Sequence, residues 1–211
     1  MSSETPIAVT VGNAFPTGKF YIIEPSFWGG GKMPGLEIAN EEKLMLPGSF
    51  IVEPPNGDPN QYPERPHLVH LPKLGAAPRD FEELASKWIV SEHLKRVFES
   101  VDPDAFAFAA CDFTQADGTP GPAYYLCNVV RTLDALDEQA SRLKIKIGDY
   151  VNGKYYSLAG GANLIFKDGV IGSAHVFRTT FADTVFCDRA LYDAVNAAHL
   201  KGVGFLDAAE C

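Results

Sequence analysis

The clearest hydrophobic periodicity in the chain follows Ser91. Four apolar residues recur there at intervals of three and four positions, which places side chains on one face of a helix: Leu94, Val97, Phe98 and Val101. Ser91 belongs to the residue types that favour the N-cap position, and the Asp-Pro pair at 102–103 cannot continue a helix. The pattern therefore predicts an amphipathic helix between these two points.

Capping signals predict two further helices. Asp80 is followed three residues later by Glu83, a capping-box pattern that predicts a short helix through about Lys87. Asp188 is a favoured N-cap residue before a run with apolar positions on one face, which predicts a helix to about His199.

Runs rich in aromatic and β-branched residues predict strands between turn-forming segments. They cover residues 19–23, 49–53, 105–113, 123–130, 143–147, 154–158, 163–166, 174–177 and 203–206. The Gly- and Pro-rich segment 117–122 predicts an antiparallel pair of 105–113 with 123–130, and residues 167–169 predict another turn. Since strands and helices are segregated rather than alternating, we expect an α+β fold with a mostly antiparallel sheet and a few segregated helices.

The chain changes character near residue 79. Turn formers divide residues 1–78 into short pieces, so we expect this part to be rich in loops, whereas residues 79–206 carry the stronger periodic patterns. With 211 residues, of which 46% are hydrophobic, the chain is large enough for one core. The expected organisation is a single domain over residues 1–211.

Charge excludes some classes of partner. Lys and Arg total 18 against 27 for Asp and Glu, which gives a net charge of -9. Nucleic acid and anionic membrane surfaces are therefore not expected partners, because both attract cationic proteins. Residues 1–6 lack the pattern of a secretion signal, and no apolar run is long enough to span a bilayer, so a cytoplasmic protein is expected. The four cysteines are scattered and are expected to be reduced thiols.

Motifs for phosphate, cofactor or metal binding are not supported. The segment 12–19 has one residue too many for a phosphate loop and places Phe20 where Ser or Thr is needed. Glycines 29–31 are not followed by a helix. His67 and His70 lie between prolines in an extended segment, where side chains three positions apart point to opposite faces. We expect no cofactor and no metal site.

An enzyme remains an alternative interpretation, either a hydrolase or an enzyme that reverses a covalent modification. No nucleophile motif surrounds any serine or cysteine, but catalytic groups can be assembled from distant positions. His175, Asp134 and Arg178 are the candidate residues for such a site. For His175 a hydrogen-bonded structural role is the simpler interpretation.

Several short segments, taken in order, resemble a known family. They are residues 88–95 (WIVSEHLK), 124–129 (YYLCNV), 133–137 with Ser141, 175–178 (HVFR), 185–188 (VFCD) followed by Leu191, and 202–205 (GVGF). This order resembles the eleventh-numbered immunity family of bacterial polymorphic toxin systems, formerly a domain of unknown function. The resemblance covers roughly residues 79–206.

The resemblance implies a binding role rather than catalysis. A protein of this kind stays in the cytoplasm of the producing cell and neutralises a cognate toxin, usually by covering its active site. The large side chains of the segments are expected in the core: Trp88, Tyr124, Leu126, Phe177 and Phe186. Asp134 and Arg178 are candidates for a structural ion pair. A structural or regulatory module without a toxin is a further alternative, and the oligomeric state stays open.

Acidic residues of the loop-rich part are the candidate toxin interface. Between Glu24 and Glu64 seven acids face two lysines, a net charge of -5. The candidate contact residues are Phe27, Trp28, Glu37, Glu41, Glu42 and Asp58. The acids suit a basic toxin surface, and the two aromatics suit an apolar anchor. Alternatively, both aromatics pack into the core and the acids form ordinary solvated surface.

Overall fold

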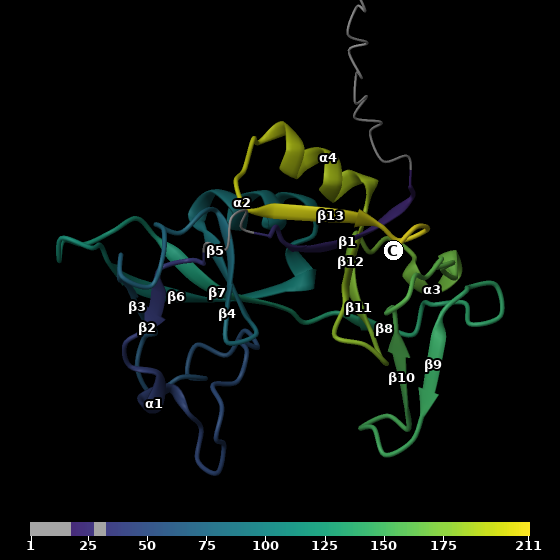
Figure 1. Ribbon diagram of the computed structural model, residues 1–211, viewed down its shortest axis with the longest axis horizontal. Coiled ribbons are helices and arrows are strands. Elements are labelled where there is room, and N and C mark those ends of the chain that lie inside the picture. The colour runs from purple at the N-terminus through teal and green to yellow at the C-terminus, as the bar shows by residue number, and fades with distance from the viewer. Residues whose placement is uncertain (1–17, 28–32) are drawn as a thin grey trace, which may run out of the picture.

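The first of two large sheets contains the N-terminal and C-terminal strands. The computed structural model describes residues 18–27 and 33–211, and in this part the strand order of the first sheet is β13-β1-β12-β11-β8 (Figure 1). Its strands are β1 (Phe20–Pro25), β8 (Thr132–Leu133), β11 (Val176–Thr179), β12 (Val185–Asp188) and β13 (Val203–Asp207). All neighbours are antiparallel except β8 and β11, which are parallel.

The second large sheet has the order β2-β3-β6-β7-β5-β4. Its strands are β2 (Leu36–Ile38), β3 (His67–His70), β4 (Phe81–Leu84), β5 (Lys87–Ser91), β6 (Phe106–Thr114) and β7 (Tyr124–Val129). Here β3 and β6 are parallel, and the other pairs are antiparallel. A separate two-stranded sheet pairs β9 (Lys144–Ile147) with β10 (Lys154–Ser157). The expected α+β class with mostly antiparallel sheet is confirmed.

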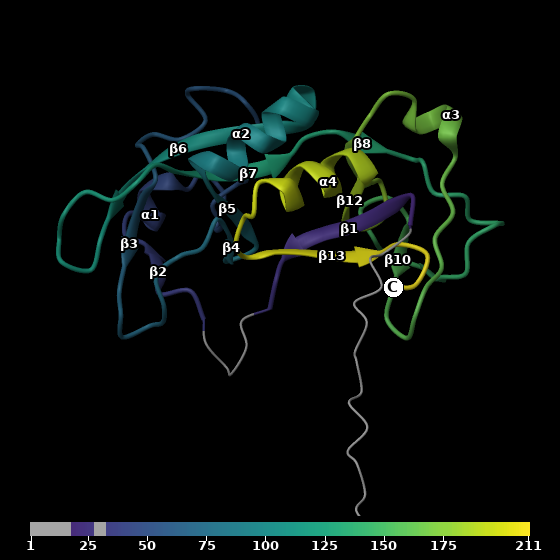
Figure 2. The ribbon, with the colours of Figure 1, turned by 90° about the horizontal axis from the view of Figure 1, so that it is seen from above.

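Two helices lie between the large sheets. The four α-helices of the described residues are α1 (Glu41–Leu44), α2 (Glu92–Val101), α3 (Asp168–Ile171) and α4 (Arg189–Ala197), and a 3-10 turn covers Pro103–Ala105. Helix α2 packs on β5 and β7, α4 packs on β1 and β12, and the two helices contact each other (Figure 2). Ser91 and Asp188 accept N-terminal hydrogen bonds from Leu94 and from α4 respectively, so both predicted caps are confirmed.

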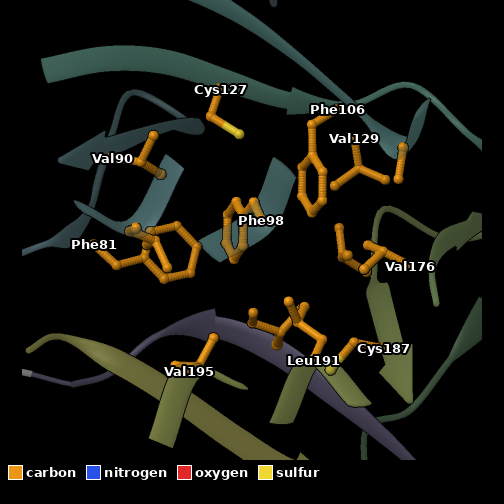
Figure 3. Packing of buried hydrophobic residues seen from close by; sticks show 14 of the residues in the cluster. Phe81, Val90, Phe98, Phe106, Cys127, Val129, Val176, Cys187, Leu191 and Val195 are labelled. Atoms are coloured by element: carbon orange, nitrogen blue, oxygen red, sulfur yellow. The ribbon is translucent and has the colours of Figure 1, made fainter. Parts of the chain in front are cut away.

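Both sheets contribute to one central core, which contains the buried stripes of α2 and α4. In Figure 3 Phe98 of α2 lies against Phe106 of β6, with ring centroids 4.4 Å apart, while Leu191 of α4 lies among residues of the other sheet. Val129 and Val176, from different sheets, belong to the same cluster. The hydrophobic contacts therefore run continuously from one large sheet to the other.

Each large sheet is buried on both faces. Along β1, Tyr21 faces the central core, whereas Phe20 faces a second cluster on the outer side of the sheet. In β7, Cys127 faces the central core and Leu126 faces a third cluster with residues of β2 and β3. Burial on two faces explains why these strands are continuous apolar runs rather than alternating patterns.

The predicted helix at 80–87 is wrong. This segment is the β4–β5 hairpin, joined by Ala85 and Ser86 with φ of 50° and 62°. The Asp80 carboxylate accepts from the Ser91 hydroxyl and the Lys201 backbone N–H instead of capping a helix. Burial of the Phe81 ring and pairing of β5 with β7 outweigh the local capping signal.

Three smaller predictions also need correction. Residues 49–53 form no strand: Phe50 is 93% exposed, and the Ser49 hydroxyl bonds the carbonyl of Ile51. Residues 163–166 make isolated bridges through Asn163 and Phe166 rather than a strand. Residues 167–169 lead into α3 rather than a simple turn. The other predicted strands are present with boundaries shifted by a few residues.

Candidate partner-binding surfaces

An acidic surface surrounds the N-terminus of α1. Glu41 and Glu42 occupy its first turn and are exposed, where their charge interacts favourably with the unpaired N–H groups of the helix. Asn40, which precedes the helix, is fixed because its side chain accepts from the His67 backbone N–H and donates to the Arg65 carbonyl. The surface is therefore anchored to β3 of the six-stranded sheet.

Glu64 connects α1 with a neighbouring hollow. Its carboxylate lies 3.2 Å from the ammonium of Lys43, which belongs to the last turn of α1. Glu64 and Asp58 line an open hollow of about 690 Å³ whose floor includes Ala109 of β6. The structure therefore brings Glu41, Glu42 and Asp58 into one region.

Glu37 lies on β2, at the open edge of the same sheet. Its side chain is exposed, while its neighbours Leu36 and Ile38 are buried. Leu36 and Ile38 pack in the same cluster as Leu44 of α1, so Glu37 projects from the opposite face of this edge strand, whereas Glu41, Glu42 and Asp58 lie on the α1 side. We use the name acidic surface for Glu37, Glu41, Glu42 and Asp58.

The predicted aromatic anchor Phe27 is exposed and lies away from α1. Phe27 is 89% exposed, so it does not pack into the core. It follows Ser26, whose backbone N–H donates to the Gly202 carbonyl and whose carbonyl accepts from Arg79. These contacts place Phe27 at the end of β1 and not beside α1. Trp28 lies outside the described residues.

An exposed apolar tip was missed by the sequence patterns. Phe50 and Ile51 are 93% and 63% exposed, and Val52 next to them is buried against the third cluster. The run of aromatic and β-branched residues predicted a strand. The neighbouring Pro47-Gly48 pair and the hydroxyl of Ser49 instead favour a turn that leaves the two large side chains outside.

A second hollow, of about 250 Å³, lies where β11 of one sheet approaches β7 of the other. We call it the cationic hollow. Its lining combines two cations, one amide and three apolar side chains: Lys87, Arg178, Asn128, Ile51, Val52 and Trp88. The side chain of Arg178 crosses from β11 and donates to the Asn128 Oδ1 atom at 3.0 Å. Asn128 in turn donates to the Pro55 carbonyl.

Arg178 is a partly buried cation without a carboxylate partner among the described residues. Burial lowers the pKa of its guanidinium, and the charge of Asp183 acts in the opposite direction. Its Nε–H is buried, and no residue in the described part of the chain accepts from it. The expected ion pair with Asp134 is not formed, because the Arg178 guanidinium donates to Asn128 and Asp134, just after β8, is exposed to solvent.

The three enzyme candidates have different partners. His175 Nδ1 lies 2.7 Å from Asp188 Oδ2, and Asp188 Oδ1 caps α4, so the imidazole takes part in a structural contact. Arg178 bonds Asn128, and Asp134 acts on Tyr156 through its charge. His67 and His70 are on an extended strand, and the described residues contain no cluster of three potential metal ligands.

The match to a known family covers nearly all of the described chain. The model of the immunity protein family Imm11 matches residues 19–210. The chain belongs to this family. No curated protein matches the chain at a significant level. The Imm11 match begins at β1 and ends after β13, so both large sheets and the central core lie within it.

Within residues 18–27 and 33–211, no helix combines the length and the apolar character that a bilayer crossing requires.

Proposed function

We propose that this Imm11 protein binds a cognate antibacterial toxin in the cytoplasm of the producing cell and neutralises it by covering its active site. Membership of an immunity protein family supports the general role. The acidic surface is the proposed contact region. Neutralisation of this kind is a binding activity and requires no cofactor.

One observation carries this assignment. Glu37, Glu41, Glu42 and Asp58 are exposed, and no described residue forms an ion pair with any of them. The carboxylates of Glu41, Glu42 and Asp58 near α1, together with Glu37 at the edge of the same sheet, create a negative potential. Such a potential attracts a basic partner and accelerates its association. A basic surface near the toxin's active site is therefore the complementary partner.

The decisive experiment is co-purification with the product of the adjacent upstream gene, followed by titration of that toxin's activity. A stoichiometric complex, with inhibition saturating near one equivalent, is the expected result. Protection at far below one equivalent, without a stable complex, would reject the covering mechanism and favour the enzyme alternative.

A charge-matched pair of variants locates the contact. The first variant carries Glu37→Gln, Glu41→Gln, Glu42→Gln and Asp58→Asn. The control carries the same charge change at four other exposed acids: Glu83→Gln, Asp104→Asn, Asp149→Asn and Glu210→Gln. At low salt the first variant should associate roughly tenfold more slowly than wild type, and the control should change much less. Equal effects would show that only net charge matters.

A further inference from the structure

The cationic hollow contains a charge that forms no ion pair with any described residue. Arg178 projects from β11, and its guanidinium has one described side-chain partner, the neutral amide oxygen of Asn128. Its Nε–H finds no acceptor within residues 18–27 and 33–211. A buried donor without a partner is unfavourable, and a partly buried cation without an anion is more so. An anionic hydrogen-bond acceptor at this position would therefore stabilise the Arg178 guanidinium.

A second cation lines the same hollow. Lys87 is 8% exposed, and its ammonium donates to the Ala85 carbonyl. Neither Lys87 nor Arg178 lies within an ion pair to any described acid. The acid that acts on Arg178 through space is Asp183, which is exposed and so is well hydrated. Two cations therefore face a small hollow in a protein with a net charge of -9.

The side chains around the hollow restrict what fits into it. The apolar wall is formed by Trp88 of β5, and Ile51 belongs to the exposed apolar tip. A planar carboxylate matches the guanidinium edge and needs less dehydration than a doubly charged phosphate. Apolar residues beside a charged anchor favour a carboxylate that is attached to a protein chain over a small free acid.

We propose that the cationic hollow binds a carboxylate side chain of the toxin, with Arg178 as its main anchor and Phe50 and Ile51 as the apolar contacts beside it. This inference rests on the proposed function and adds a second contact region to it. The acidic surface would attract the basic part of the toxin, and the cationic hollow would hold one of its acids.

The first test uses the protein alone, with sodium acetate as the probe and sodium chloride at equal ionic strength as the reference. The Nε–H signal of Arg178 is followed by nitrogen-edited NMR and assigned with Arg178→Lys. We expect a saturable shift of this signal with acetate. Arg131, which is already paired with Asp102, is the internal control and should not respond. The Arg178→Lys protein should bind acetate about tenfold more weakly, because lysine lacks the planar fork.

The second test measures affinity for the toxin. Arg178→Met should weaken the complex roughly ten- to a hundredfold, mainly through faster dissociation. Arg142→Met removes one exposed arginine elsewhere and should have little effect. Unfolding in urea checks that Arg178→Met is folded, and Arg178→Lys provides a second variant that keeps the charge.

The outcomes separate this inference from the proposed function. A saturable acetate shift together with weaker toxin binding supports both. Wild-type toxin affinity in both Arg178 variants, or an acetate response no different from chloride, overturns the carboxylate site while leaving the acidic surface intact. Tighter binding of inorganic phosphate than of acetate overturns the assignment to a carboxylate. An acetate response without any toxin complex would support the anion site and reject its occupant and the proposed function.

Discussion

The buried carboxylate of Asp102 joins the end of α2 to β11. It is 6% exposed, and its Oδ2 atom accepts from the backbone N–H groups of His175 at 2.8 Å and Val176 at 3.1 Å. The same carboxylate pairs with Arg131. In the sequence Asp102 only marks the end of a helix, but in the fold it satisfies donors that lie more than seventy positions away.

Replacing Asp102 should destabilise the protein strongly. Asp102→Ala leaves two backbone donors without an acceptor and Arg131 without its partner, so we expect a loss of about 3 kcal/mol in the free energy of unfolding. Urea denaturation of wild type and variant measures it. Asp104→Ala is the control, since Asp104 is exposed two residues away, and it should change stability by less than about 0.5 kcal/mol. Similar losses in both variants would contradict the proposed role.

At the scale of elements, the β4–β5 hairpin has a turn whose residues do not suit its backbone. Ala85 and Ser86 both have positive φ, which is unfavourable for residues with a Cβ atom and is the conformation of an Asn-Gly turn. The absence of the usual turn residues explains why the sequence did not indicate a hairpin here.

A better turn sequence should therefore stabilise the hairpin. We expect the double substitution Ala85→Asn and Ser86→Gly to raise the free energy of unfolding by about 1 kcal/mol. Thermal and urea unfolding measure the gain. Ser173→Gly is a control at an exposed position without a positive φ, and it should not stabilise. A loss of stability in the double variant would show that Ala85 and Ser86 make contacts that the turn geometry does not explain.

The β9–β10 hairpin is held to the rest of the chain through Glu138. Its carboxylate accepts from the Lys154 ammonium and from the Tyr156 hydroxyl, and these two hydrogen bonds lower the pKa of Glu138 below 4.5. Tyr156 itself is buried, and burial raises its pKa.

This contact should depend on pH. Because the pKa of Glu138 is lowered in the folded state, its stabilising effect is present above the unfolded pKa near 4.5 and is lost as the pH falls through the folded pKa. Glu138→Gln should cost about 0.5–1 kcal/mol at pH 7, since water screens this partly exposed pair, and less near pH 3. Urea unfolding at both pH values measures the difference. A cost that does not shrink in acid would assign the effect to packing instead of charge.

At the scale of the whole molecule, the central core joins the two large sheets. Phe98 of α2 lies between Phe81 of β4 and Phe106 of β6, and the same cluster contains Leu191 of α4 and Val176 of β11. Because one cluster contains residues of both helices and both sheets, we propose that the described residues 18–27 and 33–211 fold as one unit.

One cooperative transition is the expected consequence. Phe98→Ala should cost roughly 3–5 kcal/mol and shift the unfolding of both sheets together, as measured by amide hydrogen exchange of β1 and β7 in parallel with circular dichroism. Phe50→Ala, at a 93% exposed position, is the matched control and should be nearly neutral. If Phe98→Ala accelerated exchange in β7 and left β1 unchanged, the two sheets would be separate units.

Local signals in the sequence were sufficient for several elements. The caps at Ser91 and Asp188 and the apolar strand runs were predicted because the responsible atoms lie within a few residues of one another. The acids of the N-terminal part were identified from charge alone, and Glu37, Glu41, Glu42 and Asp58 are exposed in the structure. Exposure of an unpaired carboxylate follows from its own hydration and needs little information from the fold.

Contacts between distant segments were decided only by the tertiary structure. The capping signal predicts a helix at Phe81, whereas burial of its ring in the central core and pairing with β5 place it in a strand. The positive charge of the cationic hollow lacks an ion-pair partner among the described residues because Arg178 of β11 meets the neutral amide of Asn128 of β7, fifty positions earlier. The sequence determined which segments are apolar, capped or charged, since these properties belong to each segment by itself. The fold determined which donors found acceptors, because hydrogen bonding and burial depend on neighbours that the chain brings together only when it is packed.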